Sequence, residues 1–425
     1  MPNHETRRSD LLSTIVLIPS FYGLVTWVPC LYLYWLRILP WDESATSAML
    51  IFVLVPCMFT VSLLFHLDGY RGWTRNRRRY AMLPSCRWQI MASLHIIGFL
   101  GIALYVHDFS AALGGAARFW TLLATTTYVV RWQAVDTLSV GTQLSYAGWI
   151  ATALTVILVR VKRLPKKWLV VAAVQYLGNA LFLGRTRLFW ILIVTIVMLA
   201  PLIKRSLSLR RTSLIALATL VTLVVVFISI GAWIGKLQAA NVSERDSDVP
   251  YMVQNLYLYA TAGFAYFNAV VETESPHPGF EGIAYPLYQV GRYLHVSEKP
   301  RSQINATLYL PFGVNVGTFL EPFFRDGGYP LTIVGILIAT ICVDYAALYF
   351  WTSNNYFGWY ASAQLCFSSA LAGFSPKITT FPVWLFLGSA LVAMALQRRA
   401  RRHVDSRARP NDCPTIPNER TDYVR

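Results

Sequence analysis

Two arginines flank a threonine in a tight turn between apolar runs, at Gly184-Arg185-Thr186-Arg187. A guanidinium group keeps its charge at any accessible pH, and its N–H donors match phosphate oxygens in pairs. Arg185 and Arg187 therefore have the chemistry of a diphosphate clamp. The alternative is that both are anchors whose long side chains lie among lipid headgroups. Gln175 and Asn179, upstream of the turn, either add polar contacts or join neighbouring helices.

Residues 236–330 form a second concentration of polar side chains, in a segment too long for a simple connection. Its charged members include Glu272, Glu274, His277, Glu281, Arg292, His295, Arg301, Glu321, Arg325 and Asp326. None of them follows the Asp-x-Asp or His-x-x-x-His spacing of a divalent metal site, so no metal and no other cofactor is predicted. An enzyme outside the membrane has no supply of nucleotide sugars. If this segment transfers a sugar, the donor would therefore be a sugar linked to a lipid diphosphate.

Tyrosines crowd the same segment, interleaved with Leu, Val and Phe. They are Tyr251, Tyr257, Tyr259, Tyr266, Tyr285, Tyr288 and Tyr293. The apolar pattern predicts two amphipathic helices, over 251–272 and 283–296, that pack back onto the rest of the chain. Tyrosine-rich walls suit a sugar, whose rings have apolar faces and whose hydroxyls form hydrogen bonds. An aromatic belt at a membrane surface is the equal alternative.

The elements that must position these residues are membrane helices. Apolar residues make up 55% of the 425 positions, and charged residues only 14%. This composition predicts an all-α, polytopic integral membrane protein with about ten transmembrane helices and one large external loop. The spans are expected near 11–35, 47–66, 89–106, 143–160, 168–183, 187–203, 213–235, 331–350, 357–373 and 381–396.

Basic residues indicate the orientation of these spans. With this layout, 25 of the 37 lysines and arginines fall on the side of both termini, which is therefore predicted to be cytoplasmic. The large loop then faces the periplasm of a bacterial inner membrane. Because topology accounts for the net charge of +16, no nucleic-acid partner is expected.

The layout divides the chain into four regions: spans one to seven in 1–235, the loop 236–330, spans eight to ten in 331–397, and a disordered basic tail, 398–425. Residues 116–134 are apolar but interrupted by Arg118 and Arg131, which predicts an interfacial helix on the outer leaflet. An extra pair of spans there is the alternative. Asp344 lies within a span and is expected to pair with a neighbouring helix, although the other spans show no partner charge for it.

Three features together resemble the O-antigen polymerase family, which joins oligosaccharide repeat units of bacterial surface polysaccharide. The turn from Gly184 to Arg187 is similar to a Gly-(Ser/Thr)-Arg turn that opens a span in the family, with a second arginine added. The large loop that follows has a tyrosine-rich helix like Tyr257 to Phe267 and a Pro…Gly-Phe segment like Pro278-Gly279-Phe280. It closes on an Asn-x-x-Thr…Pro…Asp-x-Gly segment like Asn315 to Gly328, with a glycine where an aromatic residue is common. The resemblance covers residues 170–350.

This resemblance implies a fold of the membrane glycosyltransferase C type and a metal-independent glycosyl transfer on the periplasmic face, in lipopolysaccharide biosynthesis. Glycan on undecaprenyl diphosphate would pass to the nonreducing end of another lipid-linked repeat unit. The leaving diphosphate would be stabilised by Arg185, Arg187 and Arg292. A chain-length regulator and a flippase are the expected protein partners.

The same resemblance implies roles for loop residues. The acceptor hydroxyl would give its proton to His277, Glu272 or Asp326. Asp326 also fits a capping carboxylate beside a surface ion pair. The groove for the glycan would be lined by Tyr259, Tyr266, Tyr288, Asn315 and Thr318.

The sequence is also compatible with two other functions. An O-antigen ligase has much the same architecture, but ligases carry a histidine late in the loop, and 303–328 contains none. A transporter or flippase for lipid-linked oligosaccharide would show internal repeats and charged residues in the spans. No repeat is visible, and the spans are almost uncharged apart from Asp344.

Overall fold

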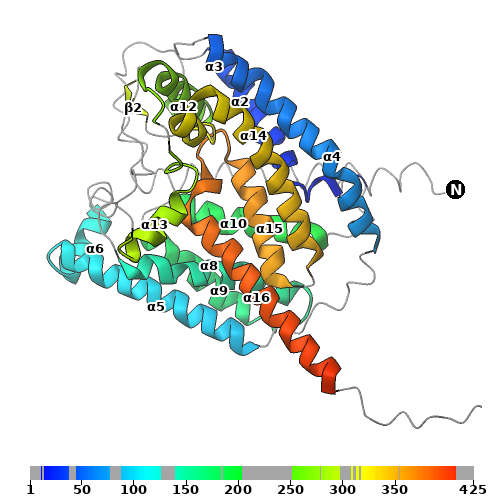
Figure 1. Cartoon of the computed structure of the whole chain (residues 1–425). Helices are drawn as coiled ribbons and strands as arrows, with labels where there is room; N and C mark the ends of the chain where they lie inside the picture. The colour runs from blue at the N-terminus through cyan, green and yellow to red at the C-terminus, as the bar shows by residue number, and fades with distance from the viewer. Residues whose placement is uncertain are drawn as a thin grey trace, which may run out of the picture.

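The computed structural model describes residues 11, 14–37, 45–76, 88–125, 139–182, 185–202, 251–277, 279–296, 308–309, 313–314, 317–353 and 355–407. These residues are almost entirely helical (Figure 1). Among them, five helices are long and apolar enough to cross a membrane: Ser47–Thr74, Trp88–Ala112, Val140–Arg160, Glu321–Thr352 and Phe381–Arg399. The chain is therefore an all-α membrane protein.

Every predicted span within the described residues coincides with a helix. The long helices are α3 (Ala45–Met49) continued by η1 (Leu50–Leu54) and α4 (Val55–Asn76), then α5 (Trp88–Ala112), α8 (Val140–Arg160), α14 (Glu321–Thr352) and α16 (Phe381–Arg407). Shorter helices are α2 (Pro19–Trp35), α9 (Trp168–Gly178) continued by η3 (Asn179–Phe182), α10 (Arg185–Leu199) continued by η4 (Ala200–Leu202), and α15 (Tyr356–Ala370). The predicted span 213–235 lies outside the described residues.

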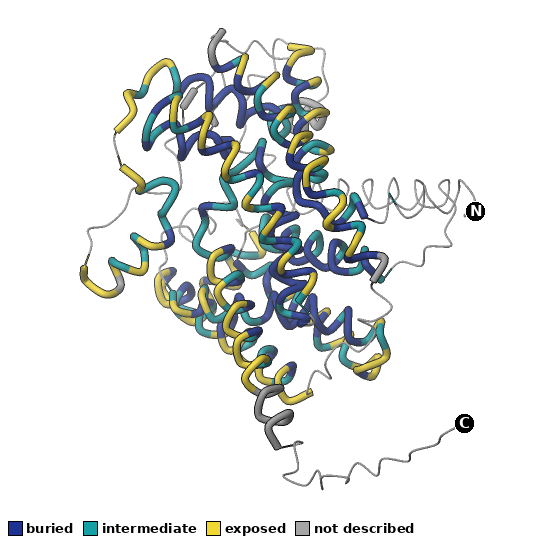
Figure 2. The backbone as a smooth tube through the Cα atoms, turned by 45° about the vertical axis from the view of Figure 1, so that its right-hand side comes forward, coloured by how far each residue is buried: buried dark blue, intermediate teal, exposed yellow. Residues whose placement is uncertain are grey.

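The outward faces of these helices are apolar, as lipid requires. Figure 2 shows buried residues on the faces turned to the interior and exposed residues on the faces turned away. On α9 the exposed face carries Val170, Val174 and Leu177. These positions share one side of a helix, so they form a continuous apolar stripe. A stripe of this kind in water would be costly, whereas in a bilayer it is solvated by acyl chains.

Glycines allow α5 and α8 to pack at very close range. A Cβ atom on Gly98 would lie 2.5 Å from the Cα of Gly148, and one on Gly101 would lie 2.4 Å from the backbone nitrogen of Ser145. Small residues have this role at helix interfaces in membranes, where van der Waals contact drives association. The close packing fixes the face of α8 that carries Ser145 and Trp149.

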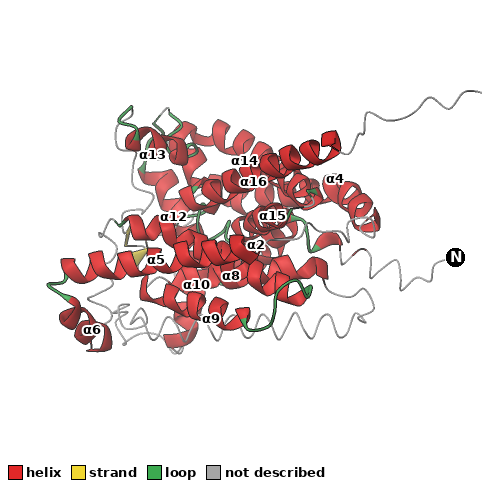
Figure 3. Cartoon of the chain, turned by 90° about the horizontal axis from the view of Figure 1, so that it is seen from below, coloured by secondary structure: helices red, strands yellow, loops and turns green. Residues whose placement is uncertain are grey.

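The two helices predicted in the loop are confirmed as α12 (Tyr251–Thr273) and α13 (Tyr285–Tyr293). The predicted amphipathic character is wrong for the middle of α12, where residues 261–270 are all buried. A short antiparallel pair follows, of β1 (Leu308–Tyr309) and β2 (Gly313–Val314). Helix α12 packs back onto α2 and α14, burying Phe264 among the aromatic side chains of Trp27 and Tyr34. In Figure 3, α6 (Ala116–Thr125) and α13 lie at one end of the bundle and the C-terminal part of α4 at the other. The end with α6 and α13 is called the loop end below.

Helix α6 has ten residues and is about 15 Å long, half the thickness of the hydrocarbon core. Phe119 on its inner side is fully buried and contacts Phe109 of α5, with ring centres 5.6 Å apart. Its length and one buried face fit the predicted interfacial helix better than an extra pair of spans. Residues 126–134 lie outside the described part of the chain.

Asp344 on α14 is fully buried and bound by two other helices. Its carboxylate accepts hydrogen bonds from the Ser20 backbone N–H (2.9 Å) and from the hydroxyls of Ser20 and Ser62 (both 2.6 Å). The predicted pairing with neighbouring helices is therefore confirmed. A neighbour that was not named from the sequence is His66 on α4, whose Nδ1 lies 3.9 Å from the carboxylate and which is charged only when protonated. A histidine in an apolar run is easily overlooked in a sequence because its charge is conditional.

The connector between α15 and α16, residues 371–380, joins the loop helices to the bundle. A Cβ on Gly263 of α12 would lie only 2.2 Å from the carbonyl oxygen of Gly373. The backbone N–H of Phe319, just before α14, donates to the carbonyl of Ala372 at 2.8 Å. The connector is thus held on two sides by the segments that begin and end the large loop.

The close approach at Gly263 predicts that a larger residue at this position destabilises the protein. Gly263→Ala should lower the free energy of unfolding by about 1–3 kcal/mol, because the added methyl overlaps a backbone oxygen that cannot rotate away. Gly388→Ala on α16 is the matched control, because nothing lies within 4 Å of a Cβ there. Thermal unfolding of the two purified variants in detergent measures the difference. Equal unfolding temperatures would show that the connector does not depend on this contact.

Candidate functional site

Arg187 lies in the first turn of α10, on an aromatic surface at the loop side of the bundle. Its Nη1 donates a hydrogen bond to the hydroxyl of Ser145 at 3.0 Å. Its Cζ lies 3.8 Å from the ring centre of Phe182, 5.5 Å from that of Trp149 and 5.6 Å from that of Tyr146. Such contacts stabilise a guanidinium group that is partly removed from water.

Asn179 orients this aromatic surface. The indole N–H of Trp149 donates to Oδ1 of Asn179 at 2.8 Å, and Nδ2 of Asn179 donates to the carbonyl of Gln175 at 2.8 Å. Of the two roles left open for Asn179, joining helices is therefore the one it has. The bond fixes the indole plane over which Arg187 lies.

A second cation, which the sequence analysis missed, lies beside Arg187. Trp190 is one turn further along α10, and its ring centre is 5.3 Å from that of Trp149. The Nζ of Lys377, in η5 (Lys377–Thr379) of the connector, lies 5.7 Å from the Trp190 ring centre. Residues three apart on a helix are neighbours, so Arg187 and Lys377 occupy adjacent parts of one surface. In the sequence, Lys377 is visible as a single lysine in the short outer connection between the last two predicted spans.

Neither cation is neutralised within the described part of the chain, where no carboxylate forms an ion pair with Arg187 or Lys377. The side chain of Lys377 is partly removed from water, and this desolvation lowers the pKa of its ammonium group to about 8. Two uncompensated cations on an aromatic surface are costly unless an anion binds to them. The arrangement therefore has the chemistry of an anion site, called the Arg187–Lys377 site below.

Of the predicted glycan residues, the structure brings Tyr259 towards this site. Its ring centre lies 5.9 Å from that of Phe374, which is in the connector with Lys377. Thr318 is fully buried, and its hydroxyl oxygen accepts the N–H of Leu320 at 3.3 Å. Tyr288 is half-buried on α13, and Asn315 lies outside the described residues.

Asp326, a predicted base, is occupied by backbone donors. Its Oδ2 accepts the N–H groups of Gly282 (3.0 Å) and Ile283 (2.9 Å), and the side chain is buried. These bonds hold the turn before α13 against the start of α14. They favour the anchoring role over proton transfer, because both N–H donors stabilise the ionised carboxylate.

An ion-pair cluster lies next to it. Arg325 binds Glu274 (Nη2–Oε1, 2.8 Å) and Glu321 (Nε–Oε1, 3.1 Å). Tyr266, predicted to bind glycan, is buried here with its hydroxyl 3.5 Å from Nη2 of Arg325. Burial, together with Glu321, raises the pKa of that hydroxyl. This cluster is a structural link between α12 and α14.

Three other predicted residues are exposed to solvent. They are His277, Glu272 and Arg292, and none of them forms a described contact with Arg187 or Lys377. Helix α10 begins at Arg185, but its side chain is outside the described part. Asp108, at the loop end of α5, was not singled out from the sequence, and it accepts the Ser139 hydroxyl at 2.6 Å. No group of three His, Cys, Asp or Glu side chains gathers among the described residues.

Comparisons with protein-family models, curated proteins and solved structures give no match to this chain.

The pKa of Lys377 gives a pH dependence that separates the two cations. Binding of inorganic pyrophosphate should weaken as the pH rises through about 8, because Lys377 then loses its charge while Arg187 keeps it. Lys377→Arg should remove this dependence and retain binding at pH 9.5. Isothermal titration calorimetry in detergent from pH 6.5 to 9.5 measures it. A wild-type affinity that is flat over this range would contradict a role for Lys377.

Proposed function

We propose that this protein is a polysaccharide polymerase of the O-antigen type. It transfers glycan from undecaprenyl diphosphate to a second lipid-linked repeat unit on the periplasmic side of a bacterial inner membrane. The observation that carries the proposal is the Arg187–Lys377 site, with two cations that lack a carboxylate partner within the described residues. The motif resemblance at 184–187 and 315–328 supports the same function.

The topology proposed for this function has ten spans with both termini in the cytoplasm. The loop end then faces the periplasm, together with α6, α12 and α13. Supporting this orientation, the five basic residues of 160–167 lie at the opposite end of α8 from Ser145 and Arg187. Cytoplasmic segments of membrane proteins carry such an excess of lysine and arginine.

In the proposed reaction, an acceptor hydroxyl oxygen attacks the anomeric carbon of the donor glycan. The bond between that carbon and the diphosphate oxygen breaks, and undecaprenyl diphosphate leaves with one more negative charge. Arg187 and Lys377 stabilise the charge that develops on the leaving oxygen, and the membrane around them strengthens the attraction. The aromatic surface of Trp149 and Trp190 keeps both cations in place before the donor arrives.

The proton of the acceptor hydroxyl must pass to a base of the loop. His277 and Glu272 are both exposed and have room to accept it, whereas Asp326 is held by backbone N–H groups. Tyr259, whose ring contacts Phe374 of the connector, gives the acceptor sugar an aromatic face. We therefore assign the base to His277 or Glu272 and the sugar contact to Tyr259.

A flippase for lipid-linked oligosaccharide is a second candidate, favoured by one observation. The buried His66–Asp344 pair is an ionisable cluster within the spans, as proton-coupled carriers require. Against this, Asp344 is already bound by Ser20 and Ser62, and the loop end carries the uncompensated cations.

Deletion of the gene in its host separates the functions, with surface polysaccharide examined on a gel. A polymerase predicts that the ladder of chain lengths collapses to single repeat units on the core. Complete loss of decorated core would instead indicate a ligase or a flippase and would contradict the proposal.

Variants then test the site within this assay. Arg187→Ala and Lys377→Ala should each lower polymerisation about 100-fold, the usual cost of removing one donor that stabilises developing charge. Arg118→Ala is the matched control, because Arg118 is an exposed arginine on α6 at the same end of the bundle. All variants must be present at wild-type levels in the membrane. A full ladder with Arg187→Ala and Lys377→Ala would exclude the clamp.

A further inference from the structure

A pocket of about 640 Å³ lies at the end of the bundle opposite the Arg187–Lys377 site. It is formed where α5 begins and where α8 turns into α9. Its lining consists of Trp88, Arg163, Leu164, Pro165, Lys167, Trp168 and Val171. Helix α8 has 21 residues and is about 30 Å long, which is the thickness of a hydrocarbon core. Ser145 of the first site lies near its start, and the pocket lies beyond its end.

The turn that shapes this pocket is well defined. Helix α8 ends at Arg160, Lys162 follows in a left-handed conformation (φ 59°), and the N–H of Arg163 donates to the carbonyl of Leu158 at 2.8 Å. Leu164 is buried in the core, which leaves Arg163 on the surface. The N–H of Trp168 donates to the carbonyl of Pro165 at 3.1 Å and starts α9. Two cations, Arg163 and Lys167, are thereby fixed on either side of Leu164 and Pro165.

The charge of this surface is one-sided. Residues 160–167 contain five basic residues and no acidic one, and neither Arg163 nor Lys167 forms an ion pair within the described part of the chain. The pocket therefore favours an anion. Both of these side chains are exposed, so the bound group lies at the surface of the membrane and not in its interior.

Two tryptophans and an apolar stripe show what kind of anion fits. Trp88 is 58% exposed, and the ring of Trp168 lies 6.0 Å from that of the buried His95. Indole rings are favoured at the level of lipid headgroups, where one face is apolar and the N–H is wet. Directly along α9 from the cations runs the exposed stripe of Val170, Val174 and Leu177. A ligand with a phosphate at one end and acyl chains at the other matches cations and stripe together.

We propose that this pocket binds the phosphodiester headgroup of an anionic phospholipid, with the phosphate between Arg163 and Lys167 and an acyl chain along the exposed stripe of α9. Basic pockets between helices on the cytoplasmic side of membrane proteins bind such headgroups. The lipid covers the joint between α5, α8 and α9, and so stabilises α8, the helix that carries Ser145 and Trp149. The site is independent of the proposed polymerase activity.

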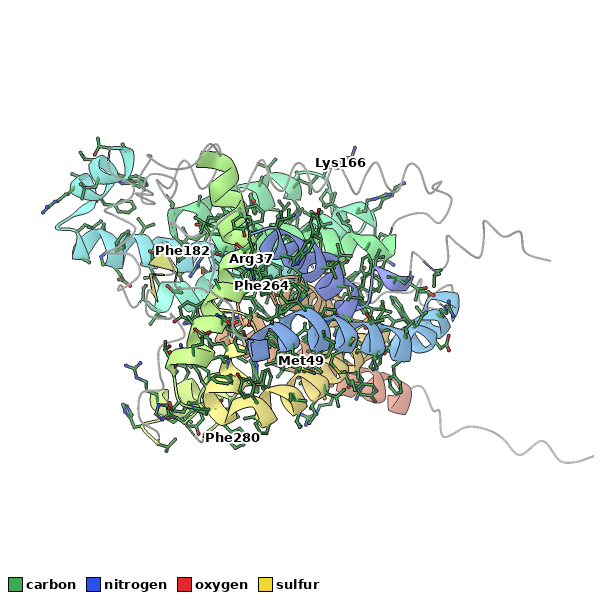
Figure 4. All side chains as sticks on the ribbon, turned by 90° about the horizontal axis from the view of Figure 1, so that it is seen from above. Arg37, Met49, Lys166, Phe182, Phe264 and Phe280 are labelled. Carbon is green, nitrogen blue, oxygen red and sulfur yellow. The ribbon has the colours of Figure 1, made fainter. Side chains whose placement is uncertain are left out.

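The test compares two doubly neutralised variants of the full-length protein. Arg163→Gln with Lys167→Gln removes the cations that line the pocket. Arg160→Gln with Lys166→Gln removes the same charge from the same segment, at exposed positions outside the pocket lining. Figure 4 shows Lys166 at the edge of the molecule, pointing away from it. The net charge is therefore matched, and only the position of the charge differs.

Binding is measured by native mass spectrometry and by thermal shift, with phosphatidylglycerol, cardiolipin, phosphatidylcholine and inorganic phosphate as separate probes. Wild-type protein and the Arg160/Lys166 variant should retain phosphatidylglycerol or cardiolipin, and the Arg163/Lys167 variant should bind at least tenfold more weakly. The double variant Arg163→Lys with Lys167→Arg keeps both charges and should bind like the wild-type protein. Equal loss in both neutralised variants, or equal retention of phosphatidylcholine, would overturn the proposal. Equal stabilisation by inorganic phosphate alone would show a free-anion site and overturn the lipid assignment.

Discussion

The close approach of Gly263 to Gly373 is the constraint on which the candidate site depends. It lets α12 lie directly against the connector 371–380, with 2.2 Å between an added Cβ and the Gly373 oxygen. The connector is also hydrogen-bonded to Phe319, and it carries Lys377 onto the Trp190 ring. One short segment thus links the loop helices, the start of α14 and the surface of α10. Moving it would displace the second cation from the first.

Three buried polar groups elsewhere in the bundle have specific partners. Asp344 is bound by Ser20 and Ser62, Trp149 by Asn179, and Asp326 by backbone N–H groups. In a medium without water, an uncompensated polar group is expensive, and proteins normally satisfy it internally. Among the described residues, Arg187 contacts one hydroxyl and three aromatic rings but no carboxylate, which is the condition expected of a site proposed to bind an anion.

Much of the fold followed from the sequence, because apolar runs of about 20 residues have few structural alternatives. The helices at 140–160 and 251–273 were predicted nearly to their ends, the helix at 88–112 was predicted six residues too short, and Arg187 was named from its turn. Lys377 was missed because its significance comes from Trp190, nearly 190 residues away in the chain. Asp326 was a possible base until its backbone partners were visible. The position of a helix is determined by neighbouring residues in the sequence. The partners of a charged group, in contrast, come from distant segments that meet only in the tertiary structure.

We propose that Arg187 and Lys377 together bind the diphosphate of a lipid-linked donor. The most direct measurement is a cryo-electron microscopy structure of the protein in nanodiscs saturated with undecaprenyl diphosphate. Diphosphate density is expected between the Arg187 guanidinium and the Lys377 ammonium, next to Trp149 and Trp190. Diphosphate density at the exposed Arg292 instead, with the Arg187–Lys377 site empty, would contradict it.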